Sequence, residues 1–276
     1  MLSNDHDGGA DTDPLAVTQV NGSPLVPGAT IALPSGALLT MAADGTYSYD
    51  PNGTFNGLGQ GQTATDSFTY QVGDGQGGFA TATASIVING VNDAPVVVDP
   101  ATGMTPVDPM HIVPAQTAQD GSAITPLDVT SFFKDPDSGD ALTLSVPAAS
   151  LPAGITFDPA TGTFAGTPAA DASQGGPASN GVYPIVITAT DSHGATVSTV
   201  VTFTIGNPIP IAIDDTATVP EHGTATGSVL ANDHDGGADT DLLSVTAING
   251  NASAVGHEIS LPSGALLTLN ADGTYV

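Results

Sequence analysis

Apolar and polar residues alternate in short runs along much of the chain. The clearest example is residues 66–90, where the runs DSFTYQV and FATATASIVI flank the glycine-rich segment Gly73–Gly78. Alternation with a period of two predicts strands with one buried face, and a glycine-rich turn between two such runs predicts a β-hairpin. No long run places apolar residues at helical spacing. The pattern therefore predicts an all-β protein.

Shorter apolar runs, separated by Gly, Pro and Asp, fill the middle of the chain. Val, Ile, Leu and Thr suit strands, and the 34 Gly and 22 Pro suit tight turns. The spacing of runs and turns predicts an antiparallel β-sandwich in this region. Its candidate strands are His111–Thr117, Ile124–Val129, Ala141–Val146, Gly162–Phe164, Tyr183–Thr190 and Ala195–Ile205.

The chain contains a long internal repeat. Residues 2–47 align without a gap to residues 230–275, and the decapeptide NDHDGGADTD recurs unchanged at Asn4–Asp13 and Asn232–Asp241. Such self-similarity predicts tandem modules of one architecture. We expect a β-sandwich lacking its first strand at 1–93, a second sandwich at 94–206, and the N-terminal part of another copy of the first at 207–276. Linkers are expected at Val91–Pro95 and Gly206–Ala212.

The two copies of the repeat extend in opposite directions. Residues 211–229 precede the second copy without a counterpart before the first, and Met1 aligns with Val229. The hairpin at 66–90 follows the first copy only. These features lead to the hypothesis that the sequence is a segment of a longer array. We expect the residues after Pro208 to be the first that a protease cleaves.

The net charge narrows the possible functions. The chain has 28 acidic residues against one basic residue, Lys134, and a formal net charge of −27 at pH 7. A surface of this kind repels nucleic acid and anionic lipid, so neither is expected as a partner. The first twenty residues contain neither the basic nor the apolar region of a signal peptide, so we expect none in them. No apolar run approaches the roughly 20 residues that span a bilayer, and the absence of Cys excludes disulfides. Water, salt or bound cations must then balance the carboxylates.

Many of the carboxylates occur as Asp-x-Asp. Alternate residues of an extended segment point to the same side, so each pair can offer two carboxylates to one ion. Calcium takes about six to eight oxygen ligands, whereas magnesium retains its waters and softer metals favour His or Cys. The pattern therefore predicts Ca²⁺ sites. The pairs are Asp5 with Asp7, Asp11 with Asp13, Asp135 with Asp137, Asp233 with Asp235, and Asp239 with Asp241.

Asp and Gly are also turn formers, and this simpler interpretation competes with metal binding. It suffices for isolated pairs such as Asp44-Gly45 and Asp272-Gly273, which have no acidic neighbours. It does not account for NDHDGGADTD, because a turn needs one or two Asp and further carboxylates repel one another. We expect His6 and His234, inside this repeat, to face solvent.

Several segments resemble known families. TDSFTYQVGDGQGGFATA (Thr65–Ala82) and VNDAP (Val91–Pro95) resemble the VCBS and bacterial cadherin-like repeats of large RTX-type surface adhesins. Three other segments resemble the dystroglycan-type cadherin-like domain: Phe132–Ser145, Leu151–Pro168 and Ala189–Ile205. The resemblance implies tandem antiparallel Ig/cadherin-like β-sandwiches joined end to end. It also implies a location outside the cell, with the export signal outside this sequence.

The resemblance further implies which residues bind calcium. In cadherins, ligands at a junction come from an Asn-Asp linker, an Asp-x-Asp pair in the following module and an Asp in a later turn. At the first junction these positions are Asn92, Asp93, Asp135, Asp137 and Asp191, with Asp140 assisting. By the same correspondence Asp74 joins Asp5 and Asp7, and Asn207 joins Asp233 and Asp235. An Asp-Arg-Glu motif is missing from the preceding module, so the usual three-ion site is not expected in full.

We therefore expect a calcium-rigidified structural segment of a large secreted or cell-surface bacterial adhesin. Its partners would be calcium, neighbouring modules and cell-surface glycans or proteins, and its parent would be attached to the outer membrane after type I secretion. The alternative is a sandwich that binds carbohydrate or a host glycoprotein. Against it, the chain has no Trp, and the strand aromatics Tyr47, Tyr49, Phe68, Tyr70 and Phe79 are expected in the core. No catalytic triad, glycosidase carboxylate pair or phosphate loop stands out, so no enzyme is expected.

Overall fold

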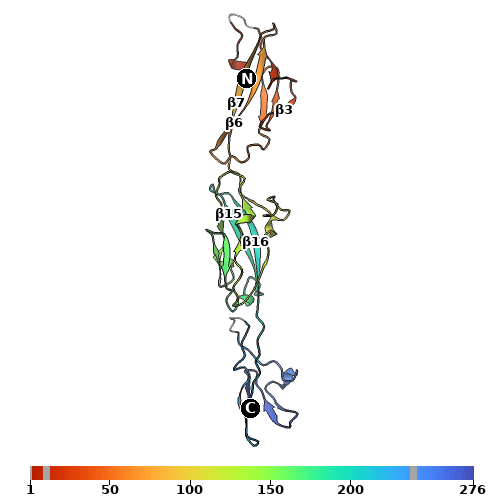
Figure 1. Ribbon diagram of the computed structural model, residues 1–276, viewed down its shortest axis with the longest axis vertical. Helices are drawn as coiled ribbons and strands as arrows, with labels where there is room; N and C mark the ends of the chain where they lie inside the picture. Colours follow the sequence, from red (N-terminus) through yellow and green to blue (C-terminus); the bar gives the residue numbers. More distant parts are fainter. Residues whose placement is uncertain (1, 9–12, 237–240) are drawn as a thin grey trace. The chain divides into compact units, whose positions relative to one another are not determined.

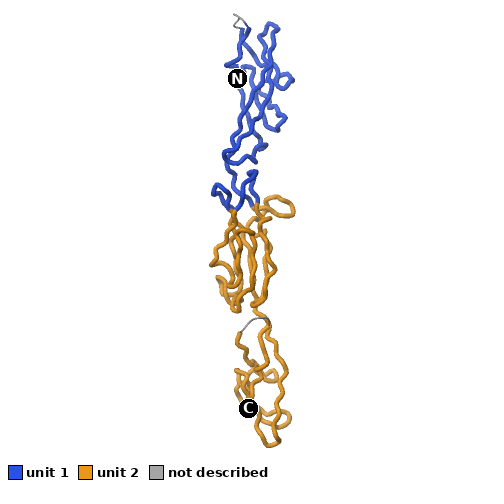
Figure 2. Tube along the Cα trace, turned by 60° about the vertical axis from the view of Figure 1, so that its left-hand side comes forward, with its two compact units in different colours: residues 1–96, 134–142, 190–197 blue, residues 97–133, 143–189, 198–276 orange. Residues whose placement is uncertain are grey.

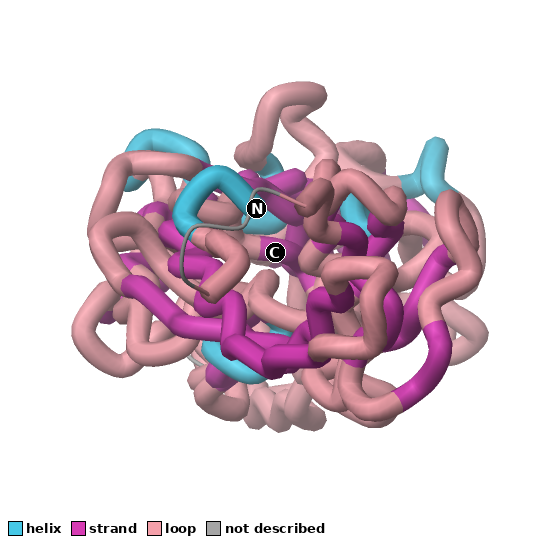
Figure 3. The backbone as a smooth tube through the Cα atoms, turned by 90° about the horizontal axis from the view of Figure 1, so that it is seen from above, coloured by secondary structure: helices cyan, strands magenta, loops and turns pink. Residues whose placement is uncertain are grey.

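The described part of the chain folds into strands, turns and short 3-10 helices. The computed structural model describes residues 2–8, 13–236 and 241–276 (Figure 1). Its strands and loops form two compact units, residues 1–96, 134–142 and 190–197, and residues 97–133, 143–189 and 198–276 (Figure 2). The all-β prediction is confirmed, since the described helices are 3-10 turns among strands and loops (Figure 3). The domain limits at residues 93 and 206 stay a prediction.

The 3-10 helices are single turns. Their bounds are η1 (Leu2–Asn4), η2 (Pro109–His111), η3 (Thr130–Phe132), η4 (Ala148–Ser150), η5 (Ala172–Gln174) and η6 (Ala252–Ala254). Within the described residues, no helix has the length and apolar character needed to cross a membrane.

The first unit contains two antiparallel sheets. One has the order β2-β1-β6-β7, from β1 (Ala16–Val20), β2 (Ser23–Pro24), β6 (Thr63–Gly73) and β7 (Phe79–Asn89). The other has the order β3-β4-β5, from β3 (Thr30–Ala32), β4 (Leu38–Met41) and β5 (Tyr47–Asp50). The predicted hairpin is confirmed, because β6 pairs with β7 from Thr63 opposite Asn89 to Gly73 opposite Phe79.

The core of this unit follows from the alternation in β6. Phe68, Tyr70 and Val72 point inward and pack in one cluster with Leu39 and Met41 of β4. Each large apolar side chain buried in this way contributes about 1.5–3 kcal/mol. β7 lies at the sheet edge and is mostly exposed. The expectation of buried aromatics is therefore wrong for Phe79 of β7, which is 64% exposed. It is also wrong for Tyr47 of β5, which is 46% exposed.

The middle of the chain forms the predicted sandwich. Its main sheet has the order β12-β15-β16-β9 and faces a sheet of order β10-β14-β13, while β8 pairs with β11. Phe164, Phe203 and Ile185 are fully buried between strands. The strand bounds are β8 (Val96–Val97), β9 (Gln116–Gln119), β10 (Leu127–Asp128), β11 (Phe133–Lys134), β12 (Thr143–Ser145), β13 (Ile155–Asp158), β14 (Thr163–Gly166), β15 (Val182–Thr190) and β16 (Thr196–Gly206).

Several details of this sandwich differ from the prediction, and one is the strand β13 (Ile155–Asp158), which was not among the candidate strands. The strand expected from His111 begins only at Gln116, because Pro109 starts the turn η2 and Asp108 Oδ1 accepts a hydrogen bond from the Met110 amide. β9 also pairs with β16 in parallel rather than antiparallel. A parallel neighbour requires a long connection rather than a hairpin, and the residues between β9 and β16 form such a connection.

The last part of the chain repeats the first with less core. It holds two small sheets, β17 (Gly227–Ser228) with β20 (Thr274–Tyr275), and β18 (Glu258–Ser260) with β19 (Leu266–Thr268). The described apolar side chains buried after Pro208 are Ile248 and Ala254. Leu267 occupies the repeat position of the buried Leu39 but is only half-buried, because no counterpart of β6 follows within this sequence to cover it.

Candidate metal centre

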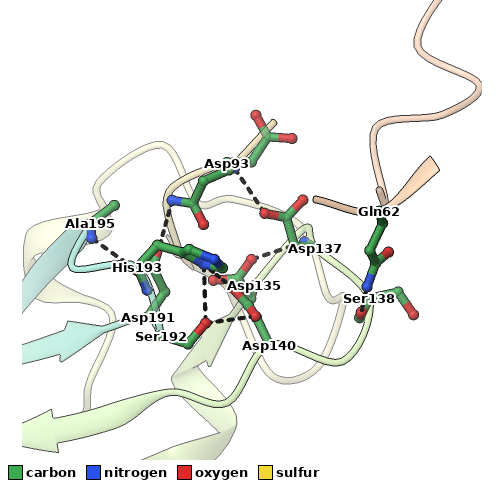
Figure 4. A network of polar contacts seen from close by, with 11 residues as sticks. Gln62, Asp93, Asp135, Asp137, Ser138, Asp140, Asp191, Ser192, His193 and Ala195 are labelled. Carbon is green, nitrogen blue, oxygen red and sulfur yellow. Dashed lines mark hydrogen bonds and ion pairs between the residues drawn. The ribbon is translucent and has the colours of Figure 1, made fainter. Parts of the chain in front are cut away.

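An acidic site forms where a linker and two turns meet in the first unit (Figure 4). The turn after β11 brings in Asp135, Asp137 and Asp140. Asp135 Oδ1 accepts a hydrogen bond of 2.9 Å from the Asp137 amide, which closes this turn. In the turn between β15 and β16, Asp191 Oδ1 accepts bonds of 2.8 Å from the amides of His193 and Ala195. Local Asx turns therefore fix the direction of these carboxylates through bonds within the chain.

The linker is joined to both turns. Asn92 Nδ2 donates a hydrogen bond of 2.9 Å to Asp191 Oδ2, and the Asp93 amide donates one of 2.9 Å to Asp137 Oδ2. The structure thus brings the predicted residues Asn92, Asp93, Asp137 and Asp191 together at one site. Their mutual contacts lie within one compact unit.

Three carboxylates are close enough to share an ion. One ligand oxygen from each of Asp135, Asp137 and Asp140 lies within 4.8 Å of the others. Asp140 is additionally held by Ser192 Oγ at 2.8 Å and by His193 Nδ1 at 3.3 Å. Ser192 and His193 were not predicted from the sequence as members of this site, although both directly follow the expected ligand Asp191 in the segment DSHG.

Buried oxygens without partners distinguish this cluster from ordinary turns. Asn92 Oδ1, Asp135 Oδ2 and Asp137 Oδ1 are buried and accept no hydrogen bond from the described residues. Asp137 is only 3% exposed. A buried carboxylate oxygen without a partner is costly. The chain's one basic side chain, Lys134, is exposed beside the cluster.

The electrostatics of the site show the same excess of negative charge. Burial raises the pKa of Asp135, and repulsion from Asp137, Asp140 and Asp191 adds to this effect. The pKa of Asp191 is lowered, first by the hydrogen bond from Asn92 and further by backbone amides of its turn. Carboxylate and amide oxygens are the ligands of hard divalent cations, so the donor set fits calcium. Soft metals would need Cys or several His.

The acidic repeat forms a separate hollow. In the first copy Asp5, Asp7 and Asp13 line it together with His6 and Asp44. Asp5 accepts a hydrogen bond of 2.8 Å from the Tyr70 hydroxyl, and burial together with this bond raises the pKa of Tyr70 to about 12. Asp11 lies outside the described residues.

The structure gives two turn carboxylates, Asp44 and Asp74, roles that differ from those expected from the sequence. Asp44 was expected to be a plain turn former. It does cap its turn through Thr46, with bonds of 2.9 Å from the amide and 2.6 Å from the hydroxyl, but it also lines the acidic hollow. Asp74, expected beside Asp5 and Asp7, is not one of the lining residues. Its Oδ1 accepts bonds of 2.7 and 3.0 Å from the amides of Gln76 and Gly78 and closes the β6–β7 turn.

The second copy of the repeat has the same arrangement. Asp233, Asp235 and Asp241 line a hollow with His234 and Asp272, the repeat positions of His6 and Asp44. The same three Asp line a neighbouring hollow with Asn207. Asp235 is buried, and Asp233 Oδ1 accepts a bond of 2.8 Å from the Ile213 amide. Asp239 lies outside the described residues.

The β-sandwiches agree with a cadherin-like, Ig-like class of tandem domains, which two family models match. Residues 1–90 match the family model of the bacterial cadherin-like domain, and residues 107–206 match that of the putative Ig domain. The chain therefore carries a bacterial cadherin-like domain followed by an Ig-like domain. Domains of the cadherin-like class are extracellular and are typically structural rather than enzymatic.

Solved cadherins are similar to the chain at low sequence identity. Mouse Cadherin-23 EC22-24 is 14% identical, with a TM-score of 0.44 over 95% of this chain and 74% of that one. Protocadherin Gamma B7 domains 1-4 are 14% identical, with a TM-score of 0.40 over 94% of this chain and 57% of that one. Drosophila N-cadherin EC1-4 is 15% identical, with a TM-score of 0.38 over 74% and 44% of the two chains. The comparison with curated proteins finds no match.

Proposed function

We propose that this chain is a calcium-binding, calcium-rigidified structural segment of a large secreted or cell-surface bacterial adhesin. The observation that carries the proposal is the set of buried oxygens without partners, Asn92 Oδ1, Asp135 Oδ2 and Asp137 Oδ1. The bacterial cadherin-like domain at residues 1–90 supports the extracellular setting. The VCBS and RTX context, type I secretion, attachment to the outer membrane and a part in biofilms belong to this proposal.

The ligands at the main site would be Asn92, Asp135, Asp137, Asp140 and Asp191, with Asp93 beside them. When bound, calcium would supply the positive charge that the chain's own side chains do not provide. The residues themselves hold the linker in register: the Asp93 amide is bonded to Asp137, and the Asn92 amino group to Asp191. A linker bonded to both turns loses conformational freedom, and this loss is what rigidification means here.

The expected energy per site is modest. For a dissociation constant near 10⁻⁴ M and about 1 mM calcium, binding stabilises the folded chain by about 1.4 kcal/mol. Several sites would add to this amount, which is a sizeable part of the roughly 5–15 kcal/mol typical of a domain.

The acidic repeat is proposed as a second place for cations. The support is the recurrence of the same hollow, with Asp5, Asp7, Asp13 and Asp44 in one copy and Asp233, Asp235, Asp241 and Asp272 in the other. Participation of Asp11, Asp74, Asn207 and Asp239 stays a prediction from the sequence.

A calcium titration of the whole chain by calorimetry and thermal melting tests the proposal. The Asp137→Asn variant should lose one site and part of the calcium-induced rise in melting temperature. Asp171→Asn is the matched control, because this exposed Asp makes no capping bond. Equal melting temperatures with chelator and with calcium would refute the proposal. A glycan array probed in calcium separates it from the carbohydrate-binding alternative, since a pure spacer binds nothing above background.

A further inference from the structure

A loop of the cadherin-like domain reaches the candidate metal centre without offering it a carboxylate. Residues Gly57–Gln62, called the 57–62 loop here, precede β6. The Ser138 amide donates a hydrogen bond of 3.0 Å to Gly57 O, and Gln62 Nε2 donates one of 3.4 Å to Ser138 O (Figure 4). Ser138 directly follows the proposed ligand Asp137, so the loop contacts the ligand turn through its backbone.

The loop also lies against Asp137 itself. A Cβ placed on Gly59 would be 3.4 Å from Asp137 Cβ and 3.7 Å from Asp137 Oδ2. Because Gly59 has no side chain, the loop backbone approaches the carboxylate closely and helps to bury it. The Asp137 side chain is therefore held between Gly59 on one side and the Asp93 amide at Oδ2.

The same loop fixes the start of the linker. The Gly90 amide donates a hydrogen bond of 2.9 Å to Gln62 O. A Cβ on Gly90 would overlap both Gly59 O and Leu58 O. Only glycine permits this approach. Gly90 stands two residues before Asn92, so the position of the loop sets where the linker side chains begin.

We infer that the 57–62 loop is a positioning element of the metal centre, and that cation binding and loop docking stabilise each other. The inference rests on the proposed function and adds a partner element to the same site. Coupling between two events is reciprocal and typically changes affinity by about 5–150-fold. A docked loop therefore raises calcium affinity, and bound calcium keeps the loop docked by the same factor.

This role explains how the first domain takes part without acidic ligands. The loop, with the sequence GLGQGQ, carries no charge. Its contribution is steric and through hydrogen bonds of its backbone and of the Gln62 side chain, which orient Asp137, Ser138 and Gly90. Weakening the loop should thus lower calcium affinity although every proposed ligand is still present.

The test uses the whole chain and three variants. Gly90→Ala displaces the loop sterically, and Gln62→Ala removes the hydrogen bond to Ser138. Val91→Ala is the control, because Val91 is 69% exposed in the same linker. Calorimetry measures calcium affinity, and amide hydrogen exchange follows the peptides that cover residues 57–62, 131–142 and 188–196. Calcium should slow exchange in all three peptides of the wild type and of Val91→Ala.

We expect Gly90→Ala to weaken calcium binding at least about fivefold and to abolish the calcium-dependent protection of residues 57–62. Gln62→Ala should shift both readouts in the same direction by a smaller factor, and it covers the case in which Gly90→Ala fails to fold. If calcium protects residues 131–142 and 188–196 but leaves 57–62 unchanged, and Gln62→Ala keeps wild-type affinity, the inference is overturned and the proposed function stands. If calcium protects none of the three peptides, both are overturned.

Discussion

The side chain of Asn92 donates a hydrogen bond of 2.9 Å from Nδ2 to Asp191 Oδ2, although 99 positions separate the two residues. This bond turns Asn92 Oδ1 away from Asp191, where it is buried without a partner. One side chain therefore both attaches the linker to the β15–β16 turn and presents an oxygen to the proposed cation. The two roles can be separated by substitution.

The Asn92→Asp variant keeps the shape of the side chain but replaces the donating amino group with an oxygen. In chelator, two carboxylates then face each other, and we expect the free energy of unfolding to fall by about 1.5–3 kcal/mol, the usual contribution of a hydrogen bond to a charged group. In calcium the loss should be smaller, because the new carboxylate can bind the ion. Urea denaturation in chelator and in calcium measures both values, and equal losses in the two conditions would contradict this assignment.

The Asp135→Asn variant should act in opposite directions with and without calcium. Burial and the neighbouring carboxylates already oppose ionisation of Asp135, so a neutral amide should raise the melting temperature in chelator. The same change removes a ligand charge and should weaken calcium binding at least about tenfold, or about 1.4 kcal/mol. Thermal melting and calorimetry check the two effects, with Asp171→Asn as the matched control. A lower melting temperature in chelator would show that burial and carboxylate repulsion at Asp135 do not destabilise the fold.

Asp66 gives the first unit a pH dependence that is independent of the metal centre. Burial acts to raise its pKa, but hydrogen bonds from Ser35 at 2.6 Å and Tyr49 at 2.8 Å, with a further bond from the Ser67 amide, outweigh it and hold the pKa below its usual range. A lowered folded pKa contributes stability above the unfolded value of about 3.9, and this contribution is lost as pH falls through the folded value.

The Ser35→Ala variant tests this pH dependence. At pH 7 in chelator we expect the free energy of unfolding to fall by about 1–3 kcal/mol, and the difference from wild type should shrink as pH falls through the lowered folded pKa of Asp66. Urea denaturation at several pH values measures it. Ser85→Ala, on the exposed strand β7, should change stability by less than about 0.5 kcal/mol. A pH-independent difference for Ser35→Ala would exclude its charge-assisted bond to Asp66.

Trypsin offers a reporter beside the metal centre. Lys134 is the one Lys or Arg of the sequence, and it ends β11 directly before Asp135. Calcium at the proposed site should protect the Lys134–Asp135 bond, whereas in chelator a single cut should yield residues 1–134 and 135–276. Mass spectrometry identifies the fragments, and a small peptide substrate controls for the effect of calcium on trypsin. Equal cleavage rates in the two conditions would argue against an ion at Asp135.

The residues after Pro208 should be the first that thermolysin cleaves. Ile248 and Ala254 are the buried apolar residues of their described part, while Leu242 and Ile209 are 99% and 80% exposed. Local opening is easiest where few apolar contacts hold the backbone. Limited proteolysis followed by mass spectrometry gives the order of cuts. Protection equal to that of residues 107–206 would contradict the expectation.

Local patterns made much of this structure predictable. Alternation in residues 66–90 predicts the β6–β7 hairpin, because one face of each strand has to match a core. The Asp-x-Asp pair follows from a local motif, whereas the Asn-Asp linker and Asp191 follow from the cadherin resemblance, and the structure brings all of them together. Asx turns create this geometry locally, since Asp135 and Asp191 bond to amides only a few residues away.

Features that depend on the fold were not predictable. The contact of Gln62 with Ser138 joins positions that no sequence motif connects. Asp44 joins the acidic hollow only because the fold brings its turn to Asp5 and Asp7. The strand expected from His111 failed because Pro109 and Asp108 start a 3-10 turn within an otherwise apolar stretch. In each case a tertiary contact or a capping bond outweighed the local pattern.

The position of β7 at the edge of its sheet bears on whether copies of the chain associate with one another. Charged residues and proline usually prevent an exposed edge strand from pairing with the sheet of another molecule. The eleven residues of β7, FATATASIVIN, include neither. Electrostatic repulsion between molecules that each carry a net charge of −27 opposes such pairing instead. Any cation that neutralises the chain also weakens this repulsion, so cation binding lowers the solubility of the chain.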